Sequence, residues 1–172
     1  ANLWSLLDLA GSFDSTGGRK AQVILANGMA RYAVSVTLYV SGINVSLVDL
    51  NGDIVCVIKK DEKFRADEEY AKIIADMVNT VISDNSVDSD SVLGVGITVP
   101  GIFDNENEVI RFAPTMGIRN FAMSNITKHI PYECIAMNNA RASAYAEFWS
   151  ERKARENMSL NSFDDSTKAR HL

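Results

Sequence analysis

The 172-residue sequence predicts an α/β domain built on a mixed five-stranded sheet with helices on both faces. Three observations lead to this prediction. Residues 31–60 alternate apolar and polar side chains in short runs, which is the period of β-strands. Residues 66–82 instead place apolar side chains every three or four positions, as an amphipathic helix does. Two later apolar runs, residues 92–99 and 134–137, each follow a helical segment, and a strand that returns through a helix lies parallel to its neighbour.

The first three predicted strands form an antiparallel half of the sheet. Gly42 separates the first strand from the second, and the pair Asn51-Gly52 is a strong hairpin signal between the second and the third. The third strand, residues 54–58, is almost entirely apolar. We therefore expect it to be a central, buried strand.

The later elements alternate between strands and helices. The helix over residues 66–82 carries three acidic residues in its first turn, where the helix dipole favours negative charge. Ser124 is a candidate N-cap for a later, short helix. The elements expected after the strand at 92–99 are a short strand at 109–112, a helix at 124–130, a strand at 134–137 and a helix from 140 to about 155. This order is typical of an actin-like, ribonuclease-H-like domain.

The two ends of the chain differ from this domain in composition. Residues 11–20 have turn and loop chemistry, with glycines that permit unusual dihedral angles, and a short strand at 22–25 follows. We interpret residues 1–30 as a linker that leaves an upstream domain; an ordinary irregular N-terminus is the alternative. Residues 31–155 form the predicted domain, and residues 156–172 are a polar tail.

Composition and charge exclude several classes of protein. Hydrophobic residues are 47% of the chain and charged residues 23%, as in a soluble globular protein. The net charge of −5 does not match nucleic acid, and no apolar run is long enough for a membrane helix or has the flanks of a signal peptide. Cys56 and Cys134 lie in apolar strands and are expected to be reduced core thiols. These observations favour a cytoplasmic protein.

A candidate ligand site lies at Asn138-Asn139. The pair comes directly after an apolar strand and opens a helix of small residues. Backbone N–H groups and the helix dipole converge at such a position, and an amide can both donate to and accept from a hydroxyl group. The alternative is that the asparagines only cap the helix.

Several segments resemble motifs of one family, the ROK sugar kinases and sugar-responsive repressors. Residues 92–104 resemble its strand that runs into a PGxxD segment, and residues 113–118 resemble its APNLGW loop. Residues 137–147 resemble its ENDANAAALGE signature. Residues 15–21 are similar to the GGRxP tail that joins a winged helix-turn-helix domain to the body of the repressors. The resemblance covers roughly residues 11–150, with the motifs in the family's order.

The chain departs from the family's kinases at both chemical centres. Residues 37–41 read TLYVS where the kinases have a DIGGT phosphate loop, so Thr37 replaces the metal-organising Asp, and Tyr39 and Val40 replace the glycines. Asn139 stands where the resemblance places the catalytic Asp, and an amide cannot act as a general base near neutral pH. We therefore expect no catalytic residue and no enzymatic activity.

The resemblance also implies which residues contact a ligand. Asn138 and Asn139 match the residues that contact the sugar in the family. The further candidates are Pro100, Gly101, Thr115 and Gly117. Pro100-Gly101 is equally well explained as a strand-ending turn, and Thr115 replaces the family's Asn. No cofactor is expected. No metal site is expected either, because neither His129 nor His171 has cysteines nearby.

The resemblance implies the first lobe of the effector-binding region of a ROK-type transcriptional regulator, with residues 156–172 leading to a second lobe. The implied partners are a sugar or sugar phosphate, DNA through an upstream winged-helix domain, and a second copy of the chain in a dimer, with no membrane. A divergent ROK sugar kinase and a scaffold lobe without a ligand are the alternatives.

Overall fold

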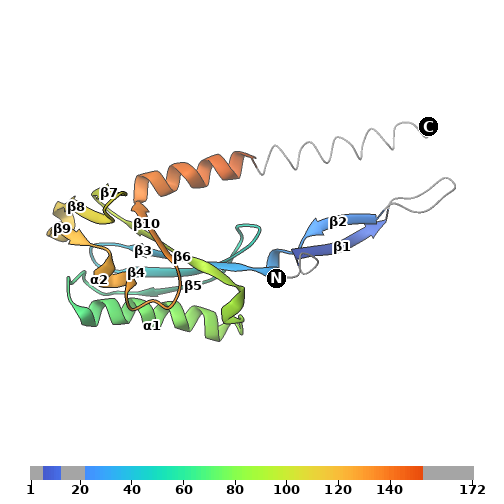
Figure 1. Ribbon diagram of the computed structural model, residues 1–172, viewed down its shortest axis with the longest axis horizontal. Coiled ribbons are helices and arrows are strands. Elements are labelled where there is room, and N and C mark those ends of the chain that lie inside the picture. Colours follow the sequence, from blue (N-terminus) through green and yellow to red (C-terminus); the bar gives the residue numbers. More distant parts are fainter. Residues whose placement is uncertain (1–5, 13–21, 153–172) are drawn as a thin grey trace.

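The computed structural model describes residues 6–12 and 22–152, and Figure 1 shows their arrangement. A mixed five-stranded sheet with the order β10-β6-β3-β4-β5 is its centre. The strands are β3 (Tyr32–Leu38), β4 (Ile43–Asp49), β5 (Ile54–Lys60), β6 (Val92–Val99) and β10 (Cys134–Asn138). β3 and β10 both run parallel to β6, whereas β4 is antiparallel to β3 and to β5. The predicted mixed five-stranded sheet is confirmed.

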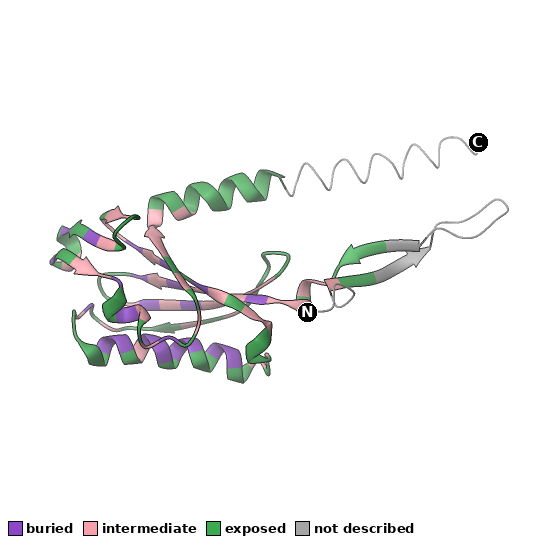
Figure 2. Ribbon diagram, viewed as in Figure 1, coloured by how far each residue is buried: buried purple, intermediate pink, exposed green. Residues whose placement is uncertain are grey.

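One face of this sheet packs on α1 (Glu68–Asp84), and the two form the hydrophobic core. Buried and half-buried residues alternate along β3, and Figure 2 shows buried residues repeating along α1. The side chains of Ile74 and Val78 are fully buried. Asp67 caps the helix by accepting a hydrogen bond from the backbone N–H of Tyr70 at 2.8 Å. The predicted helix is confirmed, with both ends two residues later than expected.

The strand β5 lies at the edge of the sheet, so the prediction of a central buried strand is wrong. Ile54, Val55 and Val57 are 66%, 49% and 42% exposed. Cys56 and Ile58 pack partly against the core, so Val55 and Val57 point to the sheet face away from α1. The run is continuously apolar because the residues on the second face are apolar too. Such a run does not show whether a strand has one neighbouring strand or two.

A second helix, described over residues 139–152, lies on the side of the sheet opposite α1 (Figure 1). It begins directly after β10. All its residues are exposed except Asn139 and Ala142, which are half-buried (Figure 2). The predicted placement of helices on both sides of the sheet is therefore found, and within the described residues α1 packs on the sheet with many buried side chains, whereas the helix over residues 139–152 does not.

A three-stranded antiparallel sheet follows β6. It consists of β7 (Ile102–Asp104), β8 (Val109–Ala113) and β9 (Ile118–Ala122). Only the strand at 109–112 was expected.

The short helix α2 (Ser124–Thr127) comes next, and its N-cap position is Met123 rather than Ser124. Met123 is fully buried and its N–H donates to the carbonyl of Glu108 at 2.9 Å, so burial of Met123 sets the start of α2. The predicted capping role of Ser124 is wrong.

The N-terminal segment forms a separate two-stranded ribbon of β1 (Leu7–Ser12) and β2 (Gln22–Ala26). Gly11 and Ser12, expected in a loop, belong to β1 because they pair with β2; the rest of that expected loop lies outside the described residues. A 3-10 turn, η2 (Gly28–Ala30), joins the ribbon to β3. The carbonyl of Gly28 accepts a hydrogen bond from the N–H of Leu50 at 2.9 Å, which holds the base of the ribbon against the β4–β5 turn.

Two further observations concern the described residues. Cys56 and Cys134 are free thiols that pack against the core but are half-buried, whereas core positions were expected for both. Burial, with a smaller contribution from Glu108, raises the pKa of the Cys134 thiol to about 11. None of the described helices is long and apolar enough to cross a membrane.

Candidate functional site

The candidate site lies where three parallel strands end. Thr37 of β3 is in register with Thr98 of β6, which is in register with Met137 of β10. Parallel strands that share a register end at the same edge of a sheet. Asn138 is in register with Val99, so Asn138 and Pro100 lie next to each other at this edge. Ligands of open α/β sheets bind outside the carboxyl ends of the strands.

Asn138 joins two of the predicted segments through its side-chain amide. Its Nδ2 donates a hydrogen bond to the carbonyl of Gly101, 37 residues earlier in the chain. Its Oδ1 accepts from the backbone N–H of Ala140 at 2.8 Å and of Arg141 at 3.4 Å, so Asn138 is the N-cap of the helix over residues 139–152. The capping alternative is thus found in the structure. One N–H of the amide remains for a further partner.

Gly101 occupies a position that only glycine fits. Its φ of +96° lies in the left-handed region. A Cβ there would collide with the carbonyl oxygen of Phe112 and lie 2.7 Å from the Cβ of Ala113. Pro100-Gly101 is therefore a tight strand-ending turn that packs on the end of β8. This close approach also brings the start of the loop at residues 113–117 beside the site.

Asn139 is half-buried at the first turn of the helix. Its Oδ1 is buried and has no hydrogen-bond partner among the described residues. A buried, unpaired amide oxygen costs about 1–3 kcal/mol. A hydroxyl group of a ligand could donate a hydrogen bond to Asn139 Oδ1 and so remove this cost. The unpaired oxygen is what the structure adds to the sequence interpretation of Asn139.

Thr115 and Gly117 lie on the 3-10 turn η4 (Pro114–Met116) and at its end. Gly117 has a φ of +68° and open space around it. It lines a hollow of about 330 Å³ together with Phe64 and Arg119, and the described lining includes neither Asn138 nor Asn139. The structure thus brings Pro100, Gly101, Asn138 and Asn139 together and leaves Thr115 and Gly117 on a neighbouring turn.

The segment at residues 37–41 forms the end of β3 and the turn into β4. Tyr39 and Val40 are 45% and 40% exposed. The N–H of Tyr39 donates to the carbonyl of Gly42 at 2.9 Å, and the carbonyl of Val40 accepts from Phe64 at 3.2 Å. The turn is closed by these bonds, and it presents two bulky side chains where the resemblance predicts glycines.

Sequence reasoning assigned no role to Asp104, which the structure shows to organise the β7–β8 turn. Its carboxylate accepts hydrogen bonds from the side chain and N–H of Asn107, the N–H of Glu106 and the guanidinium of Arg111, whose Nη2 lies 2.6 Å away. The hydrogen bonds from Asn107, and after them those from Arg111, lower the pKa of Asp104 to about 2. The signal was an Asp at the start of a polar turn, which is a common turn-forming position.

The described residues contain no group of three or more His, Cys, Asp or Glu side chains placed to hold a metal ion. The site instead offers amide groups and backbone at a strand edge. Neutral donors and acceptors of this kind recognise hydroxyl and other uncharged polar groups.

The mixed five-stranded sheet with helices on both sides is that of an actin-like domain, and the candidate site lies at the carboxyl ends of its three parallel strands. A sequence model of the ROK family matches residues 34–161, and the chain belongs to this family. Thus the predicted family and fold are confirmed.

The chain is similar to the xylose repressor of Bacillus subtilis, with 30% identity over 138 residues that make up 80% of this chain and 36% of that protein. It is 24% identical over 137 residues to the xylose repressor of Caldicellulosiruptor bescii, covering 78% of this chain and 34% of that protein. The chain therefore spans about a third of the length of the curated relatives it matches.

Solved structures share the fold at lower identity. A ROK family transcriptional regulator, described as a homolog of the E. coli MLC protein, superposes with a TM-score of 0.63 and 18% identity, over 83% of this chain and 37% of its own. A ROK family glucokinase from Streptomyces griseus, in complex with glucose and AMPPNP, superposes with a TM-score of 0.53 and 22% identity, over 68% of this chain and 36% of its own.

Proposed function

We propose that this chain is the first lobe of the effector-sensing region of a ROK-type transcriptional regulator. It contributes to binding a sugar or sugar phosphate without catalysing a reaction. DNA is contacted by a winged-helix domain upstream of residues 1–30, and the regulator acts in the cytoplasm as a dimer.

The comparisons favour a regulator over a kinase. The curated relatives named above are both xylose repressors. The superposition on the ROK regulator extends over 83% of this chain, whereas the superposition on the glucokinase covers 68%. The additional matched length supports assignment to the regulator branch of the family.

The observation that carries the proposal is the amide at position 139. Asn139 lies at the helix start beside the other predicted contacts, where a general base would be needed for phosphoryl transfer to a sugar. An amide retains the shape of that residue and its hydrogen bonds but lacks its proton affinity. Thr37 and Tyr39, in place of a carboxylate and a glycine, remove the support for a metal-bound nucleotide at the neighbouring strand end.

The proposed ligand contacts are those at the carboxyl edge of the sheet. Asn138 contributes its remaining N–H, and Asn139 contributes its unpaired Oδ1. Pro100 and Gly101 shape the floor of the site. Thr115 and Gly117 would contribute from the η4 turn.

The experiment is a sugar panel on the full-length regulator. Thermal shifts are measured with xylose, other pentoses and hexoses, and their phosphates, and ATP turnover is measured on the same samples. We expect at least one sugar to raise the melting temperature with no ATP turnover. Sugar-dependent turnover would establish the divergent kinase instead, and no shift with any sugar would establish a scaffold lobe.

A further inference from the structure

Phe64 lies in the loop between β5 and α1, and its side chain is only 9% exposed. Its ring packs edge-to-face on Tyr70 of α1, with 5.1 Å between the ring centres, and on Phe121 of β9, with 5.7 Å between them. Such aromatic pairs stabilise a structure by more than the burial of their area. The three rings therefore join α1, the loop before it and the three-stranded sheet of β7, β8 and β9.

The backbone of the loop is fixed to the turn between β3 and β4. The N–H of Phe64 donates a hydrogen bond to the carbonyl of Val40, and the N–H of Glu62 donates to the carbonyl of Ser41, both at 3.2 Å. A displacement of the loop would break these bonds. Phe64 thus presents its ring to β9 from a position that the five-stranded sheet determines.

A left-handed residue turns Phe121 to the inner face of the three-stranded sheet. Residues 119 and 121 would share a face in a regular strand. Asn120 between them has a φ of +53°, a conformation that asparagine adopts more readily than most residues other than glycine. Arg119 is exposed, with its guanidinium 4.8 Å from the ring centre of Phe112. Phe121 is half-buried instead, and it pairs with the fully buried Ile110.

The η4 turn lies between two fixed points of the structure. It follows the end of β8, which packs on Gly101, and it precedes β9, where Phe121 meets Phe64. Gly117, at the end of the turn, and Phe64 line the same hollow of about 330 Å³. The position of the turn, and of Thr115 within it, therefore depends on both contacts.

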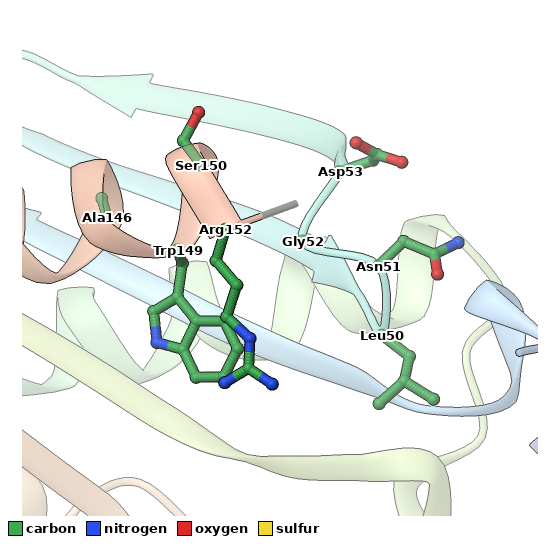
Figure 3. Close-up of a pocket in the computed structure, with 8 residues that line it drawn as sticks. All are labelled: Leu50, Asn51, Gly52, Asp53, Ala146, Trp149, Ser150 and Arg152. Carbon is green, nitrogen blue, oxygen red and sulfur yellow. The ribbon is translucent and has the colours of Figure 1, made fainter. Parts of the chain in front are cut away.

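This hollow is separate from a second one of about 740 Å³. The second hollow lies between the β4–β5 turn at residues 50–53 and the helix over residues 139–152, as Figure 3 shows. The described linings of the two hollows share no residue. Substitution of Phe64 therefore tests the η4 turn without altering the second hollow.

We propose that Phe64 is a positioning residue for the η4 turn. Its contact with Phe121, which the left-handed Asn120 makes possible, holds Thr115 and Gly117 in place beside the candidate site. Phe64 acts through β9 and needs no contact with the ligand. The inference rests on the proposed function only where it connects the turn with ligand affinity, because the position of the turn can be measured without a ligand.

The first measurement is amide hydrogen exchange of residues 114–122 in the ligand-free, full-length regulator. In Phe64→Leu, exchange there should be about threefold to tenfold faster, the factor that corresponds to one edge-to-face aromatic pair. Tyr32→Leu is the matched control, because Tyr32 is also 9% exposed but lies at the start of β3. We expect it to leave exchange of residues 114–122 unchanged. Unchanged exchange in Phe64→Leu, or an equal increase in Tyr32→Leu, would overturn the proposal.

Asn120 supplies a second pair of variants, which leaves the buried rings intact. Asn120→Gly keeps the left-handed conformation accessible, whereas Asn120→Val strongly disfavours it. We expect exchange of residues 114–122 to stay at the parent rate in Asn120→Gly and to rise in Asn120→Val. Phe64→Leu combined with Asn120→Val should exchange no faster than the faster single variant, because both changes remove the same contact. Effects that multiply in the double variant, or equal rates in Asn120→Gly and Asn120→Val, would contradict the role of Asn120.

The second measurement is calorimetric titration of the same proteins with xylose and with each other sugar of the panel. We expect binding to be about threefold to tenfold weaker in Phe64→Leu and Asn120→Val, and close to the parent value in Tyr32→Leu and Asn120→Gly. Parent-like affinity in Phe64→Leu despite faster exchange would overturn the connection between the turn and the ligand. If the parent protein bound no sugar of the panel, the proposed function would fail, and the exchange rates would still decide whether Phe64 positions the turn.

Discussion

Gly101 and Phe112 approach each other so closely that the backbone of one excludes any side chain on the other. The contact joins the turn after β6 to the end of β8, and Asn138 bonds to the same glycine. One small residue thus connects the five-stranded sheet, the three-stranded sheet and the start of the helix over residues 139–152. The stability of this junction can be measured.

Gly101→Ala should destabilise the domain by about 2 kcal/mol or more, because a left-handed φ and a clash with backbone atoms act together. Gly117→Ala is the control. Its φ is also positive, but nothing lies within 4 Å of a Cβ, so only the conformational cost of about 1–2 kcal/mol applies. Urea unfolding of both variants measures the difference. Equal losses would show that the contact with Phe112 is unimportant.

Tyr70→Phe should leave stability unchanged or raise it by up to about 1 kcal/mol. The ring of Tyr70 is fully buried and packs edge-to-face on Phe64, but its hydroxyl has no hydrogen-bond partner among the described residues. Tyr70→Ala should instead cost about 3–5 kcal/mol through the cavity it leaves. A loss of more than 1 kcal/mol in Tyr70→Phe would reveal a hydroxyl contact.

The same residue predicts a loss of stability in alkali. Burial raises the pKa of Tyr70 from 10.0 to about 12. The unfolded state therefore releases the tyrosine proton first, so the free energy of unfolding is unaffected by this group below pH 10 and falls as the pH rises from 10 towards 12. Unfolding midpoints measured over this range should fall more steeply for the parent protein than for Tyr70→Phe. If the midpoints of the parent protein and of Tyr70→Phe fell equally with pH, the raised pKa of Tyr70 would be contradicted.

Asp104 predicts the opposite dependence in acid. Its pKa is lowered to about 2, first by the hydrogen bonds from Asn107 and then by Arg111. The unfolded carboxyl binds its proton at higher pH, so the contribution is complete above about pH 4 and is lost as the pH falls towards 2. Asp104→Asn should flatten this part of the stability curve, and Asn107→Ala should flatten it partly. An unchanged acid limb in Asp104→Asn would rule out the contribution.

Asn139→Asp tests the chemical argument directly. The buried position of the side-chain oxygen disfavours a charged carboxylate there, so we expect a lower melting temperature at pH 7 than at pH 5. We also expect no ATP turnover, because Thr37 and Tyr39 still occupy the neighbouring strand end. Ser143→Asp, at an exposed position near the start of the same helix, controls for added charge there. Sugar-dependent turnover in Asn139→Asp would mean that the nucleotide site is intact.

The sequence alone determined the elements whose signals are local. The alternation along residues 32–49 predicted β3 and β4, and the helical period predicted α1, because each pattern depends on neighbours a few residues apart. The motifs predicted the family and placed Asn138-Asn139 at a helix start. The amide at position 139 and the loss of the phosphate-loop residues could also be read without a structure.

Only the tertiary structure decided what depends on residues distant in the chain. An apolar run made β5 look central, but its position at the edge follows from which strands pair. The sheet of β7, β8 and β9 rests on such pairing too. The partner of Asn138 lies 37 residues away, so no local pattern could distinguish its tie to Gly101 from simple capping. Local propensity selects the elements, whereas long-range packing selects their neighbours, and the candidate site is made where such neighbours meet.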